Sequence, residues 1–101
     1  MYGNTTSIRF LLNNLVVGTV NAASSKNVDV DVTAVLPLGC GIDVHAREAQ
    51  TGGLTWYAVR LDANTIRIVF VNGTAGNIVA SDTIEYDVYV KLPTGELQQT
   101  I

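Results

Sequence analysis

The sequence predicts an all-β protein: a single antiparallel β-sandwich of about seven strands, of jelly-roll or immunoglobulin-like kind. Apolar and polar residues alternate with a period of two in several short segments, as they do along half-buried strands. Turn-forming residues separate these segments at short intervals, and no segment has convincing helical periodicity. The 101 residues are enough for one domain, 1–101, in which residues 1–6 and 93–101 are expected to be short extended N- and C-terminal arms.

The first two expected strands are residues 5–12 (TTSIRFLL) and 15–20 (LVVGTV). Asn13 and Asn14 lie between them. Since Asn is the residue other than glycine that most readily adopts positive φ, we expect a two-residue turn here.

Three further segments, residues 27–33, 40–47 and 84–92, show strict alternation. A half-buried strand segregates its apolar side chains in this way, whereas a helix does not. The side chains expected to face inward are Val28, Val30 and Val32; Ile42, Val44 and Ala46; and Ile84, Tyr86, Val88 and Val90.

Residues 54–71 are expected to form a hairpin around Asp62-Ala63-Asn64, because Asp and Asn favour tight turns. The second strand of the hairpin is apolar on both faces, which is typical of a strand in the middle of a sandwich or beneath a neighbouring subunit. The residues predicted to point into the core are Val30, Val44, Trp56, Ile68 and Val88.

Charged residues make up only 15% of the chain, against roughly 25% in a typical soluble domain. Few charged residues remain to cover the surface. This low charge density favours a protein whose surface is partly covered by other protein chains. The net charge of −3 and the scattered basic residues argue against nucleic-acid binding and against an anionic membrane surface. No signal peptide or membrane span is expected.

The sequence holds no catalytic motif, and we expect no enzyme activity, no cofactor and no metal. His45 is the single histidine and lies among charged residues of one strand face, as surface histidines do. Asp29, Asp31, Asp43 and His45 would converge on a cation only if their two strands paired. Cys40 is expected to be a small buried side chain.

Aromatic residues leave carbohydrate binding open. Trp56 and Tyr86 are expected to be core residues, whereas Tyr57 and Tyr89 are candidates for stacking on a sugar ring.

Two stretches, residues 10–25 and 68–81, contain no charged residue. Their polar side chains are all short. Residues 72–81 are too apolar for an idle loop, and we expect them to pack against a neighbouring subunit or another protein. The candidate interface residues are Ile78, Val79, Asn72, Thr74, Leu15, Val16 and Val17.

Residues 56–90 resemble a segment common in small structural proteins of tailed bacteriophages. The resemblance rests on residues 63–68 (ANTIRI), on Asn72-Gly73-Thr74 followed by a linker of small residues, and on residues 86–90 (YDVYV). Residues 16–32 also look like the first strands of such proteins.

The resemblance implies a virion structural protein that is made in the host cytoplasm, with the capsid surface favoured over the tail. A capsid decoration (cement) protein, bound as a homo-oligomer to the major capsid protein lattice, is the leading hypothesis; a trimer is favoured and a dimer is the alternative. A tail- or fibre-associated module that binds a receptor or carbohydrate is the second hypothesis.

Overall fold

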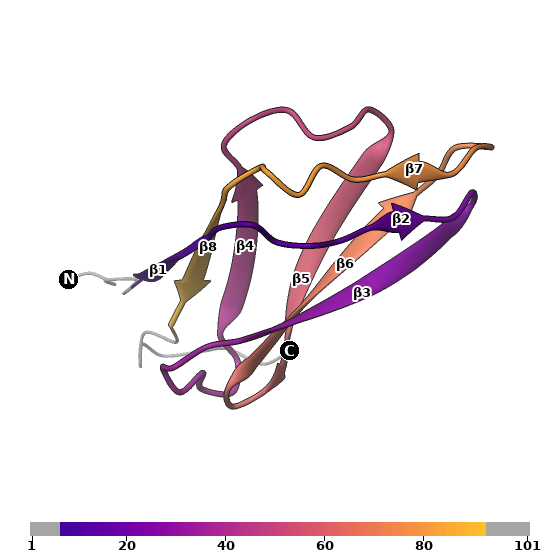
Figure 1. Cartoon of the computed structure of the whole chain (residues 1–101). Coiled ribbons are helices and arrows are strands. Elements are labelled where there is room, and N and C mark those ends of the chain that lie inside the picture. The colour runs from indigo at the N-terminus through magenta and orange to yellow at the C-terminus, as the bar shows by residue number, and fades with distance from the viewer. Residues whose placement is uncertain (1–6, 93–101) are drawn as a thin grey trace.

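The computed structural model describes residues 7–92, and the expected arms 1–6 and 93–101 lie outside these residues. Within the described range the chain is all-β, with eight strands in three antiparallel sheets (Figure 1). The strands are β1 (Ser7–Leu12), β2 (Thr19–Val20), β3 (Ser24–Asp31), β4 (Gly41–Ala46), β5 (Leu54–Asp62), β6 (Thr65–Asn72), β7 (Ile78–Val79) and β8 (Tyr86–Lys91).

Two sheets have three strands each, in the orders β1-β8-β4 and β3-β6-β5, and β2 pairs with β7 in a two-stranded ribbon. Strands β4 and β5 come into contact where the two larger sheets meet, and there the Trp56 Nε1 atom donates a hydrogen bond to the Val44 carbonyl oxygen at 2.9 Å. Both larger sheets contribute side chains to one hydrophobic core.

Three aromatic rings stand at the centre of this core. Trp56 and Phe70 come from the β3-β6-β5 sheet, and Tyr86 comes from the β1-β8-β4 sheet. The Tyr86 ring meets Trp56 edge-on at a centroid distance of 5.8 Å and Phe70 at 6.3 Å. These edge-to-face contacts add specific geometry to apolar burial and link the two sheets.

The alternation predicted from the sequence is confirmed in β3, β4 and β8, whose predicted inward residues are buried or packed against the core. The hairpin around Asp62-Ala63-Asn64 is also confirmed: β5 pairs with β6, and the Asp62 carboxylate accepts a hydrogen bond from the Asn64 amide. All five predicted core residues lie in the core or against it.

The expected hairpin at Asn13-Asn14 is wrong. Strand β1 pairs with the last strand, β8, and the strand that follows Asn14 is only the two residues of β2 in the ribbon. Asn14 does adopt positive φ (54°), but Gly18 turns the backbone again (φ 76°), so the intervening residues pass from one sheet to the ribbon without forming a ladder. The expected single sandwich of about seven strands likewise differs from the eight strands and three sheets of residues 7–92.

The ribbon brings the two charge-poor stretches together. Strand β2 belongs to residues 10–25 and β7 to residues 68–81, with Thr19 opposite Val79 and Val20 opposite Ile78. The Ala80 amide also donates to the Gly18 carbonyl oxygen at 3.0 Å. Strands β2 and β7 lie side by side in Figure 1. Val20 and Ile78, one from each stretch, are buried within the chain.

Candidate functional site: an apolar sheet face

The outer side of the β3-β6-β5 sheet carries an apolar face, which we define as Tyr57 and Val59 on β5 and Val69 and Val71 on β6. Strand β6 is central in the sheet and directs Ile66, Ile68 and Phe70 into the core, so its alternate residues point outward. Tyr57 is 57% exposed and Val59 43% exposed, whereas Val69 is only 8% exposed. Large apolar side chains thus lie on the solvent side of a sheet whose inner side is already packed.

The strand register orders the outer side in four rows, the last of which holds Asp31 and Thr65. Ser25, Val71 and Thr55 lie side by side in one row, and Asn27, Val69 and Tyr57 form the next. The third row consists of Asp29, Arg67 and Val59. Hydroxyl groups therefore lie at one end of this surface, the Asp29–Arg67 ion pair and Asp31 lie toward the other end, and apolar residues lie between them on β5 and β6.

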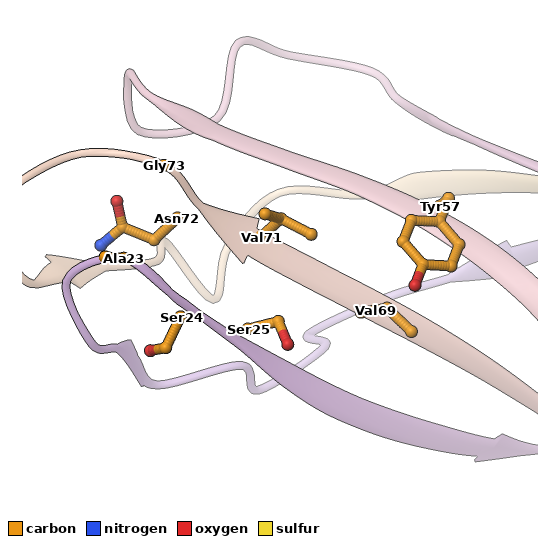
Figure 2. Close-up of a pocket in the computed structure, with 8 residues that line it drawn as sticks. All are labelled: Ala23, Ser24, Ser25, Tyr57, Val69, Val71, Asn72 and Gly73. Atoms are coloured by element: carbon orange, nitrogen blue, oxygen red, sulfur yellow. The ribbon is translucent and has the colours of Figure 1, made fainter.

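An open groove of about 400 Å³ runs along the hydroxyl end of this surface. Figure 2 shows Tyr57, Val69 and Val71 on one side of it and the backbone of β3 with Ser24 and Ser25 on the other. Ala23, Asn72 and Gly73 complete its lining. The groove is shallow and partly apolar, which suits contact with another surface better than enclosure of a small molecule.

The ion pair at the other end is bidentate. Arg67 Nε lies 2.8 Å from Asp29 Oδ1, and Nη2 lies 3.0 Å from Oδ2. These hydrogen bonds hold the pKa of Asp29 below its ordinary value. Both charges are satisfied within the chain and cancel each other.

The outer side of the β1-β8-β4 sheet is different because it is covered by charges. Asp87 accepts a bidentate contact from Arg47 and a contact from Arg9 at 3.1 Å, and Lys91 lies 3.0 Å from Asp43. The hydrogen bonds from Arg47 lower the pKa of Asp87. This sheet surface is suited to water.

The residues considered for catalysis or metal binding are not brought together. Asp29 and Asp31 lie on β3, Asp43 and His45 lie on β4, and these strands do not pair. Among the described residues there is no group of three or more His, Cys, Asp or Glu side chains that could hold a metal ion. His45 instead packs edge-on against Tyr89. Cys40 is half-buried against the core. Residues 7–92 contain no helix long and apolar enough to cross a membrane.

The predicted interface residues divide into two groups. Three of them are buried within the chain itself: Val17, Asn72 and Ile78. Their side chains therefore cannot contact a partner. Val16 and Val79 are 69% and 68% exposed. Thr74 is exposed and Leu15 packs partly against the core. The interface itself stays a prediction, now resting on the exposed members.

Asn72 connects the end of β6 to the β2-β7 ribbon through side-chain hydrogen bonds. Its Nδ2 atom donates to the carbonyl oxygens of Val20 and Gly76, and its Oδ1 atom accepts from the amide and the hydroxyl of Thr74. The side chain is 1% exposed and ties the end of β6 to the ribbon. The Asn-Gly-Thr pattern therefore serves the fold.

The aromatic residues are placed largely as predicted. Tyr86 is fully buried, and its hydroxyl accepts a hydrogen bond from Gln50 Nε2 at 2.6 Å. Trp56 packs against the core. Tyr57 is the exposed ring beside the groove, and Tyr89 is half-exposed on the charged sheet.

Sequence reasoning did not identify the apolar face as a site. The signal was present, because β6 is apolar on both sides, but the sequence left open whether Val69 and Val71 would be covered by a second layer of the same chain. Val35 and Leu38, in the loop before β4, are 71% and 80% exposed. The alternation of apolar and polar residues does not predict this exposure.

No protein-family model matches this chain, and neither does any curated protein or solved structure.

Proposed function

We propose that this chain is a non-enzymatic structural protein that assembles with other protein chains through exposed apolar surface. Its proposed place is the capsid surface of a bacteriophage virion, as a decoration protein bound to the major capsid protein lattice. The two larger sheets would then act as a β-sandwich of jelly-roll or immunoglobulin-like kind that carries the ribbon at one end.

The observation that carries the proposal is the distribution of exposed apolar side chains. Eight large apolar residues of the described range are between 42% and 80% exposed. Tyr57 and Val59 place part of this exposure on one sheet face, and the four most exposed side chains, Val16, Val35, Leu38 and Val79, lie in the loops and the ribbon. Exposed apolar area of this kind is costly in an isolated domain and is typical of a surface that another protein covers. The virion placement rests on the resemblance of residues 56–90.

The experiment is co-expression of the chain with the major capsid protein encoded in the same genome, followed by sedimentation of the particles. The chain should sediment with the particles at a fixed ratio, and its addition to particles that lack it should raise the temperature at which they open. Particles that sediment without the chain would overturn the decoration role.

Carbohydrate binding is the second candidate, favoured by one observation: the exposed Tyr57 ring borders a groove whose other side presents the hydroxyls of Ser24 and Ser25. An aromatic face with hydroxyls beside it suits a sugar ring. Binding on a glycan array that is lost in Tyr57→Ala and kept in Tyr89→Ala would favour this function over assembly.

A further inference from the structure

We infer that Asn72-Gly73 is a site of spontaneous deamidation which the closed β2-β7 ribbon protects, and that a chain modified there can no longer close the ribbon. In this reaction the backbone nitrogen of one residue displaces the side-chain amide of the asparagine before it. The site goes beyond the proposed assembly function and does not depend on it.

The sequence offers one position at which this reaction is sterically unhindered. Asn72 is the only asparagine followed by glycine, and every other asparagine precedes a residue with a side chain. A side chain on the following residue crowds its backbone nitrogen, whereas glycine leaves that nitrogen open to approach. Gly73 is exposed, so water reaches this part of the chain.

The reaction needs only base and water. The Gly73 nitrogen gives up its proton and attacks Asn72 Cγ. The new carbon–nitrogen bond closes a succinimide ring, the bond from Cγ to Nδ2 breaks, and Nδ2 takes up a proton and leaves as ammonia. Water then adds to one of the two ring carbonyl groups and breaks one carbon–nitrogen bond, which yields aspartate or isoaspartate.

Hydrogen bonds hold the Asn72 side chain in one orientation while the ribbon is closed. Nδ2 donates to the Val20 carbonyl oxygen at 3.0 Å and to the Gly76 carbonyl oxygen at 2.8 Å. Oδ1 accepts from the Thr74 amide at 2.9 Å and from the Thr74 hydroxyl at 2.7 Å. Rotation of Cγ toward the Gly73 nitrogen would break these bonds together.

The backbone of Asn72 is held as firmly as its side chain. As the last residue of β6 it lies opposite Ser24 of β3 and Leu54 of β5, and it is 1% exposed. Backbone and side chain gain the freedom that ring closure needs only when the ribbon separates from the end of β6. Deamidation should therefore proceed from this open state, at a rate set by its population.

The product does not fit the place of the asparagine. An ionised aspartate only accepts hydrogen bonds, so the two bonds that Nδ2 donates are lost and a carboxylate oxygen faces the carbonyl oxygens of Val20 and Gly76. An unpaired charge at a buried position is strongly unfavourable. Isoaspartate in addition lengthens the backbone at the end of β6. Conversion should therefore leave the ribbon open.

The first test compares folded protein with protein in guanidinium chloride, both kept in mildly alkaline buffer and followed by mass spectrometry of the intact chain and its peptides. In guanidinium chloride Asn72 should convert before every other asparagine. In the folded protein its conversion should be at least about a hundredfold slower, because only the open fraction reacts.

Matched variants test the role of the ribbon. Ile78→Ala removes a buried side chain of β7 and should speed conversion in the folded protein at least about tenfold, whereas Val79→Ala, at the exposed neighbouring position, should leave the rate unchanged. Should Ile78→Ala fail to fold by circular dichroism, Thr74→Ala replaces it, since it removes one hydrogen bond to Oδ1.

Gly73→Ala tests the attacking nitrogen. A Cβ at this position meets no atom within 4 Å, and Gly73 is not among the residues with positive φ, so alanine fits the folded chain. This variant should keep the fold and slow conversion at least about tenfold in guanidinium chloride, where the ribbon plays no part.

The consequence of conversion is tested with Asn72→Asp. The Ala80 amide donates to the Gly18 carbonyl oxygen at 3.0 Å in the closed ribbon, and its hydrogen exchange should be at least about tenfold faster in this variant than in the wild type.

Equal conversion rates in folded and denatured protein would overturn the inference, as would earlier conversion of another asparagine in guanidinium chloride. Equal rates in Ile78→Ala and Val79→Ala would remove the role of the ribbon, and wild-type exchange of the Ala80 amide in Asn72→Asp would show that the product still closes it. None of these results depends on capsid binding, so they stand apart from the test of the proposed function.

Discussion

Replacing Asn72 with alanine should destabilise the protein far more than replacing any exposed asparagine. Asn72 Nδ2 donates to Val20 O at 3.0 Å and Gly76 O at 2.8 Å, and Oδ1 accepts from Thr74 N at 2.9 Å. The truncation leaves these partners without the side chain, and the contact with Val20 is buried. Leaving a buried polar group unsatisfied costs about 1–3 kcal/mol, and the partly exposed partners recover some of their hydrogen bonds from water, so the expected loss is about 2–4 kcal/mol.

The assay is equilibrium unfolding in urea with circular dichroism. Since a domain of this size has a stability of about 5–15 kcal/mol, the loss should shift the midpoint strongly without changing the slope. Asn77→Ala is the matched control in the same segment: Asn77 Oδ1 accepts one exposed hydrogen bond from the Ala22 amide, and its removal should cost at most about 1 kcal/mol.

Equal effects of the two substitutions, or an Asn72→Ala midpoint within error of the wild type, would refute this account. The burial of Ile78 and the β2-β7 pairing would then hold the ribbon against β6. The hydrogen bonds of Asn72 would make no net contribution to the free energy of unfolding. An intermediate midpoint with a lower slope would also contradict it, since the ribbon would then unfold separately from the core.

Three further predictions concern the core, the charged sheet and the ribbon. Ile68→Ala, at a fully buried position of β6, should cost roughly 2–5 kcal/mol in urea unfolding, and wild-type stability would mean that its inward face is misassigned. Because Arg47 lowers the pKa of Asp87 below 3.8, the ion pair stabilises the fold above that pH, and this stability is lost as the pH falls through the lowered value; Asp87→Asn should flatten the acid limb of thermal stability measured from pH 5 to 2, and an unchanged limb would show that the pair is inert. Val79→Asp, at a 68% exposed site of β7, should leave the melting temperature unchanged and weaken co-sedimentation with capsids; an unfolded variant would place Val79 in the core, and unaltered binding would place the capsid contact elsewhere.

The sequence by itself determined which side of each long strand faces inward. Val30, Val44, Trp56, Ile68 and Val88 could be assigned to the core because side chains alternate along any strand, whatever its neighbour. The hairpin at residues 62–64 was also predictable, since a tight turn fixes the pairing of the two strands that it joins.

Only the tertiary structure decided which strands pair. Backbone hydrogen bonds are the same for every partner, so nothing local in residues 7–12 distinguishes the distant β8 from the nearby β2. For the same reason the pairing of β2 with β7, and with it the burial of Ile78 within its own chain, could not be foreseen. The sequence also could not show which side of the β3-β6-β5 sheet is the outer one. Val69 and Val71 are apolar in the sequence, but a second layer of the same chain could have covered them. The way the sheets are stacked decides this, and it depends on packing across the whole molecule.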